Sequence, residues 1–173
     1  MKQPNNADAE LQDKELVITR TFNAPRELVF KMWAQAEHMA HWWGPKGFEL
    51  IIAELDLRPG GTFHYQMRSP DGFEMWGKFA YHEIDPPQRI VFVTSFSDRD
   101  GSITRAPFNP SWPLEVMNVL TLEEVNGKTK LTLAGGPINA SEDELKVFRE
   151  GVSSMQQGFG GTFDQLDEYL ATI

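Results

Sequence analysis

A long apolar stripe near the C-terminus is the feature that most constrains how this 173-residue chain can fold. Ser141, with Glu144 three residues later, predicts the capped start of a helix that continues to about Tyr169. Large apolar residues recur there at spacings of three or four, so they share one helix face over about 25 residues. Such a stripe needs a broad apolar partner surface. It consists of Leu145, Phe148, Val152, Met155, Phe159, Phe163, Leu166 and Leu170.

Short β-rich segments between turn signals supply that partner. Asn126-Gly127 between two apolar runs is the strongest signal, because both residues tolerate the positive φ angles of a tight hairpin turn. The elements do not alternate as β-α-β, so we expect an antiparallel sheet with one face in solvent and the other covered by the long helix. The predicted strands cover residues 15–22, 48–57, 62–69, 73–84, 88–96, 114–124 and 128–134.

The segment after the first strand predicts two short helices. Pro25 suits the first position of a helix, and the helical spacing of apolar residues from Arg26 to Trp43 breaks once, near Gln35. The sequence therefore predicts an α+β fold in which about seven antiparallel strands curve around a long C-terminal helix. We interpret the polar residues 1–14 as a flexible leader and residues 15–173 as a single domain.

Composition argues against several classes of function. The 16 basic residues stand against 25 acidic ones, for a net charge of −9, so neither nucleic acid nor anionic membrane is an expected partner. The chain has no cysteine, which excludes disulfides, thiolate metal sites and thiol nucleophiles. No window is apolar over the ~18 residues of a membrane span, and no signal peptide is recognisable, so we expect a cytoplasmic location.

Six short phrases stand in a characteristic order along the chain. They are RTFNAP at 20–25, WWGP at 42–45, DLRPGG at 56–61, SPDG at 69–72, IDPP at 84–87 and LDEYL at 166–170. Together they resemble the START-like, birch-pollen-allergen-like (SRPBCC) superfamily. Within it, the chain is similar to the branch homologous to the C-terminal domain of the activator of the heat-shock-protein-90 ATPase.

This resemblance implies a helix-grip fold, in agreement with the predicted elements. It also implies a cavity between the long helix and the sheet that holds a small hydrophobic or aromatic molecule. Some members of the superfamily are polyketide cyclases or lipid-transfer modules. The activator itself has an additional N-terminal chaperone-binding domain, whereas only a 14-residue leader precedes the first strand here, so a chaperone partner is not expected.

The long helix departs from its relatives at three glycines. Gly158, Gly160 and Gly161 surround Phe159 where the resemblance implies one Gly and one Trp. Each glycine costs a helix about 0.8–1 kcal/mol relative to alanine. We interpret this weak stretch as the moving part that opens the cavity mouth, since binding lids come from the less stable parts of a fold.

Strand alternation sorts the candidates for the cavity, because residues of one parity point to one face. Each apolar candidate could simply be core, so the argument rests on the set, in which methionines and aromatics suit an adaptable apolar site. Asn118 and Tyr81 are polar groups on inward faces and need a ligand, a water or a backbone partner. The predicted ligand-cavity residues are Phe63, Tyr65, Met67, Met75, Phe79, Tyr81, Phe92, Trp112, Asn118, Met155 and Phe159.

The leading hypothesis is a non-catalytic module that carries, senses or sequesters a small hydrophobic molecule. It assigns no catalytic residue, cofactor or metal. A polyketide cyclase or dehydratase is the first alternative, for which Tyr81, Glu115 and Arg68 are the available ionisable groups. The second is a chaperone-related partner-binding module with a stress-response role, which needs an exposed patch outside the cavity. A homodimer through the first strand or a sheet edge is compatible with the sequence, without a specific signal for it.

Two histidines on the second short helix invite a metal interpretation. His38 and His41 are three residues apart, a spacing that can hold zinc with Glu37 nearby. The sequence offers no convincing third ligand, so we expect no metal site.

The connection at residues 98–113 is long for a compact domain, and such loops often act as lids. Phe108 and Trp112 on it could cover one mouth of the cavity. The alternative is a surface excursion held by its three prolines.

Overall fold

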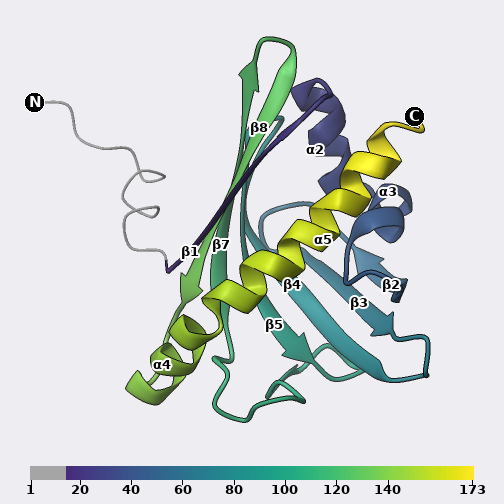
Figure 1. The fold of residues 1–173 in the computed structure, drawn as a ribbon. Helices are drawn as coiled ribbons and strands as arrows, with labels where there is room; N and C mark the ends of the chain where they lie inside the picture. The colour runs from purple at the N-terminus through teal and green to yellow at the C-terminus, as the bar shows by residue number, and fades with distance from the viewer. Residues whose placement is uncertain (1–14) are drawn as a thin grey trace, which may run out of the picture.

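The computed structural model describes residues 15–173, so the expected leader at residues 1–14 lies outside the described part. One antiparallel sheet curves around a long C-terminal helix, which confirms the predicted α+β helix-grip fold (Figure 1). The elements are β1 (Leu16–Phe22), α2 (Arg26–Ala34), α3 (Ala36–Trp42), β2 (Glu49–Leu55), β3 (Thr62–Arg68), β4 (Glu74–Asp85), β5 (Arg89–Ser97), β6 (Ile103–Thr104), β7 (Val116–Val125), β8 (Lys128–Pro137), α4 (Glu142–Glu150) and α5 (Val152–Leu170).

The sheet follows the order β1-β8-β7-β5-β4-β3-β2, with β6 paired to β5 off this path. The seven longer strands match the seven predicted ones to within a few residues. At the turn from β7 to β8, Asn126 and Gly127 have φ angles of 53° and 80°, which confirms the expected hairpin. Strand β6 was not predicted, because its two residues are too few to show a period-two pattern.

The C-terminal helix begins as predicted but is broken once. The Ser141 hydroxyl accepts a hydrogen bond from the Glu144 N–H, and the Glu144 carboxylate accepts one from the Ser141 N–H, so the capping box is formed. The expectation of one continuous helix was wrong, because the chain divides at Gly151 into α4 and α5. Beyond that break, α5 passes through its three internal glycines without interruption.

The apolar stripe of α5 packs on the concave face of the sheet, with α2 and α3 beside its C-terminal half (Figure 1). Phe163 is fully buried, with its ring centroid 5.9 Å from that of Phe22 and 6.3 Å from that of Trp33. A smaller cluster of Leu16, Val116 and Phe148 lies at the α4 end. The core is therefore divided into two parts, and the space between them is where a cavity can form.

Arg20 ties the first strand to the last helix. Its guanidinium donates to the carboxylates of Asp164 and Asp167, over 2.6 and 2.8 Å, and to the Gly160 carbonyl oxygen over 3.1 Å. These contacts hold the glycine-containing part of α5 against the sheet edge. Among residues 15–173, none of the helices is both long and apolar enough to span a membrane.

Candidate ligand cavity

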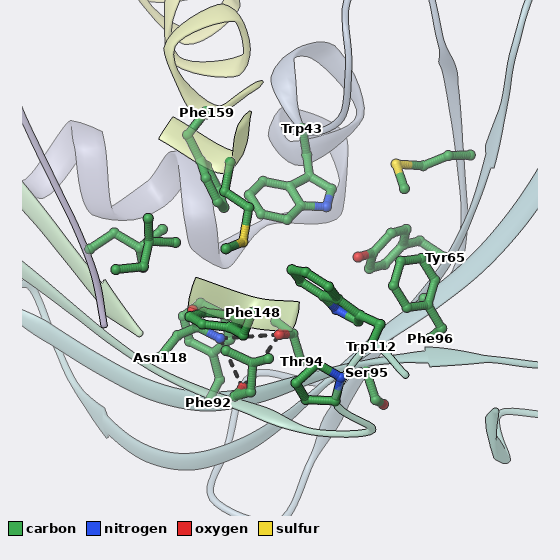
Figure 2. Close-up of a pocket in the computed structure, with 17 residues that line it drawn as sticks. Trp43, Tyr65, Phe92, Thr94, Ser95, Phe96, Trp112, Asn118, Phe148 and Phe159 are labelled. Atoms are coloured by element: carbon green, nitrogen blue, oxygen red, sulfur yellow. Dashed lines mark hydrogen bonds between the residues drawn. The ribbon is translucent and has the colours of Figure 1, made fainter. Parts of the chain in front are cut away.

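A cavity lies between the inner face of the sheet and the junction of α4 with α5 (Figure 2). An inner chamber of about 180 Å³ adjoins an outer cleft of about 500 Å³. Trp43, Tyr65, Trp112, Met155 and Phe159 line both, so the two parts adjoin and share walls. The sheet supplies the floor and the helices supply the roof.

Gly77 on β4 shapes the floor by leaving room for Tyr65 on β3. The two residues are directly opposite in the β3–β4 ladder, and a Cβ atom on Gly77 would lie 2.7 Å from the Tyr65 hydroxyl oxygen. A glycine inside a strand often marks a bulge or leaves room for a ligand. The structure shows instead that the Tyr65 ring occupies that room and lies across the strand, with its hydroxyl pointing into the cavity (Figure 2).

A second glycine accommodates the polar group on the opposite wall. Asn118 on β7 stands opposite Gly135 on β8, where an added Cβ would lie 2.8 Å from the Asn118 Oδ1 atom. The Asn118 Nδ2 group donates to the Thr94 hydroxyl over 3.2 Å and to the Val116 carbonyl over 3.0 Å. The amide predicted to face inward therefore does so, and its donors are used by the protein itself.

Aromatic rings close the mouth of the outer cleft. Trp112 packs against Gly151 at the break between α4 and α5, and its ring centroid lies 5.4 Å from that of Phe148. Phe108 is 63% exposed and contacts both Phe96 and Trp112, with centroid distances of 5.6 Å to each. Phe108 and Trp112 thus line the mouth as the sequence suggested, whereas opening and closing of this loop stays a prediction.

The walls of the cavity carry almost no ionisable group. Within residues 15–173, the side chains that line the chamber and the cleft include no Asp, Glu, Lys, Arg or His. Tyr65 is the exception, and burial raises its pKa to about 12, although the nearby Trp43 indole opposes part of that rise. The Tyr65 hydroxyl is therefore neutral near pH 7. The site can enclose an apolar molecule but offers no group suited to proton transfer at neutral pH.

The structure brings together seven of the eleven predicted cavity residues. Phe63, Phe79 and Tyr81 face inward but are buried in the core behind the wall. Met75 is only partly shielded and lies outside the lining. The seven that line the cavity are Tyr65, Met67, Phe92, Trp112, Asn118, Met155 and Phe159.

Several lining residues were missed by the selection from the sequence. Thr94, Phe96 and Val116 share the inward parity of predicted neighbours, so alternation alone could have included them. Trp43 lies at the end of α3, where no periodicity tells which way a side chain points. The helix break at Gly151 brings Phe148 onto the wall, and that break was not foreseen.

The polar residues considered for other chemistry lie away from the cavity. His38 contacts the Tyr169 hydroxyl through Nδ1 at 2.7 Å, and the His41 ring stacks on Tyr169 with centroids 4.5 Å apart. No group of three or more potential metal ligands occurs among residues 15–173. Arg68 pairs with Glu74 over 3.3 Å on the outer face of the sheet, and Glu115 does not line the cavity.

Comparisons with known proteins follow this geometry. A family model described as Activator of Hsp90 ATPase homolog 1-like protein matches residues 23–171. No curated protein matches the sequence. Among solved structures, protein Ms6760 from Mycobacterium smegmatis has 29% sequence identity and a TM-score of 0.70, and the match covers 90% of each chain.

Two further solved structures are similar at lower identity. One is a protein from Arthrobacter aurescens with 23% identity and a TM-score of 0.74, covering 91% of this chain and 86% of that one. The other, described as an AHSA1 protein, comes from Silicibacter pomeroyi; it has 19% identity and a TM-score of 0.70, covering 91% and 97%. At these identities the likeness is evidence for the fold alone.

Proposed function

Because this chain belongs to the family of Activator of Hsp90 ATPase homolog 1-like proteins, as its six characteristic phrases indicated, we propose that it binds a small hydrophobic or aromatic molecule. The binding place is the space formed by the inner chamber and the adjoining outer cleft. In this role the protein is a carrier, a sensor or a sequestering module in the cytoplasm.

One observation carries the proposal: a space between sheet and helix, in two adjoining parts, whose walls are aromatic and aliphatic. Its volume falls within the range of small-molecule sites, which are mostly apolar and have a few placed polar groups. A water-filled chamber with these walls would satisfy few hydrogen bonds, so an apolar occupant gains from displacing water.

The same walls argue against the enzyme alternative. Tyr81, Glu115 and Arg68 were the groups that could have served as acid or base, and none of them lines the cavity. The one ionisable lining group, Tyr65, keeps its proton at neutral pH. A binding role needs no such group, so it agrees better with the observed walls.

The uncharged fluorescent probe N-phenyl-1-naphthylamine tests the proposal, because its emission rises in apolar surroundings. The matched variants are Gly158→Leu and Gly160→Leu, since an added Cβ meets no atom within 4 Å at either position. Gly158 lines the outer cleft, whereas Gly160 does not. Both replacements raise helix propensity, so they differ mainly in where the new side chain stands.

We expect saturable probe binding to the wild-type protein and to Gly160→Leu. Gly158→Leu fills the cleft and should weaken binding about tenfold or more, which corresponds to ~1.4 kcal/mol. Melting temperatures of all three proteins exclude unfolding as the cause. Absence of binding to the folded wild type, or equal binding by both variants, would argue against this cavity as the site.

A further inference from the structure

Several of the hydrogen-bonding groups on the cavity wall are used by the protein itself. Asn118 donates twice, to Thr94 and Val116, and its Oδ1 atom leans over Gly135. Thr162 donates to the Gly44 carbonyl oxygen over 3.0 Å. The donors of Asn118 and Thr162 are therefore not free to recognise a ligand.

Tyr65 is different. Its hydroxyl donates no hydrogen bond to another residue among residues 15–173, although the Trp43 indole lies close to its oxygen, and it points into the space between Trp43 and Trp112 (Figure 2). Tyr65 lines both the chamber and the cleft, so this hydroxyl stands where the two meet.

The packing around Tyr65 fixes the direction of the hydroxyl. The ring stacks on Phe63, with centroids 4.6 Å apart and 29° between the planes. It packs edge to face against Phe79, with a centroid distance of 5.9 Å. Gly77 lies beneath the ring without a side chain. The tyrosine is only 6% exposed, so its hydroxyl is held in place before a ligand arrives. Such prior ordering lowers the entropic cost of recognition.

The neighbouring indole decides which partner the hydroxyl needs. The Trp43 Nε1 atom is buried and lies on the side facing Tyr65 (Figure 2), where its N–H acts on the Tyr65 hydroxyl and opposes part of the rise in the pKa of that group. An indole N–H is only a donor. Because this N–H faces the hydroxyl oxygen, the group left to find a partner is the Tyr65 O–H, which needs an acceptor such as a carbonyl, ether or ester oxygen.

The lack of charge on the wall restricts the ligand further. A buried ionised group without an opposite charge or several hydrogen bonds is strongly disfavoured. A carboxylate or an ammonium ion would find no counter-charge among the lining residues. The ring-rich wall, with Phe92, Phe148 and Phe159 around the chamber, suits a planar molecule that stacks or packs edge to face.

We propose that the ligand is an uncharged, largely aromatic molecule carrying an acceptor oxygen, and that the Tyr65 hydroxyl recognises this oxygen at the junction of chamber and cleft. This inference rests on the proposed function, because it names the ligand class for the same cavity. Tyr65 is then the residue that separates oxygen-bearing aromatics from plain hydrocarbons.

Three related compounds test the inference by isothermal titration calorimetry at pH 7.5. 2-Acetylnaphthalene carries the acceptor, 2-ethylnaphthalene has nearly the same shape without it, and 2-naphthoate adds a negative charge. The test variant is Tyr65→Phe, which keeps the ring. The matched control is Tyr81→Phe, because Tyr81 is also buried with an unpartnered hydroxyl but does not line the cavity.

We expect Tyr65→Phe to weaken binding of 2-acetylnaphthalene about five- to tenfold, the equivalent of one net hydrogen bond, and to leave 2-ethylnaphthalene within about twofold. Tyr81→Phe should change neither affinity. 2-Naphthoate should bind the wild type at least about tenfold more weakly than the ketone does.

The possible failures are distinguishable. If neither uncharged naphthalene binds the wild type, the proposed function fails together with this inference. If both bind, and Tyr65→Phe alters them equally or not at all, the proposed function stands and the recognition by Tyr65 is wrong. Tighter binding of 2-naphthoate than of the ketone overturns the claim that the ligand is uncharged.

Discussion

Replacing Gly77 by alanine tests how the cavity floor is built. The added Cβ would stand 2.7 Å from the hydroxyl oxygen of Tyr65 and 2.8 Å from its Cζ atom. Since ordinary contacts begin near ~3.5 Å, the ring must move by roughly 0.8 Å. Phe63, Phe79 and Trp43 surround that ring, so the remaining direction is into the chamber.

The expected energy follows from two opposing effects. Overpacking a well-filled region costs about 1–3 kcal/mol. Alanine in place of glycine within a strand stabilises the folded state by about 0.5–1 kcal/mol, because less backbone freedom is lost on folding. We therefore expect Gly77→Ala to lower the free energy of unfolding by about 1–2 kcal/mol, measured by urea denaturation, and to weaken probe binding by narrowing the chamber.

A double-mutant cycle isolates the cause. In a Tyr65→Ala background the clash is gone, so Gly77→Ala should be neutral or stabilising by up to about 1 kcal/mol, which gives a coupling of about 2 kcal/mol between the two sites. If Gly77→Ala lowers the free energy of unfolding by the same amount in the wild type and in Tyr65→Ala, the glycine is required for a reason other than the Tyr65 ring. If it stabilises the wild type, the close approach of Tyr65 to this strand is wrong.

Two further predictions concern pH and local stability. A tyrosine in the unfolded chain ionises near ~10, whereas burial keeps Tyr65 protonated up to about 12, so its contribution to stability is complete below pH 10 and is lost as pH rises towards 12. The free energy of unfolding, measured by urea denaturation, should therefore fall less between pH 8 and pH 11 for Tyr65→Phe than for the wild type. An equal decrease in both proteins would contradict the burial of this hydroxyl. If the glycine stretch opens the mouth, hydrogen exchange should be faster at the backbone amides of residues 158–161 than at the amide of Val152. Equal exchange rates at these amides would exclude that opening.

Local patterns predicted most of the architecture. Alternation along the strands placed Tyr65, Phe92 and Asn118 on the inner face, and the turn signal at Asn126-Gly127 located the β7–β8 hairpin. These predictions succeed because each depends on near neighbours in the sequence. The capping residues at Ser141 marked a helix start for the same reason.

Features set by distant contacts could not be predicted in this way. The break at Gly151 coincides with packing against Trp112, which lies 39 residues earlier in the chain by residue number. Inward parity also does not separate a cavity wall from the core behind it: Tyr65 and Phe79 share a face, yet only the first lines the cavity. That distinction depends on how far the helices stand from the sheet.

The joining of β1 to β8 and α5 has a consequence for how this protein is made. Leu16 and Phe159 both line the chamber, and β1 pairs with β8, so the pocket needs segments that lie far apart in the sequence. A nascent chain leaving the ribosome cannot complete it until synthesis of the last helix is finished. Contacts this distant in sequence also slow folding, because long loops must close first. A ligand therefore meets a receptor that is complete only once α5 has been synthesised, and a chain cut before α5 would hold none.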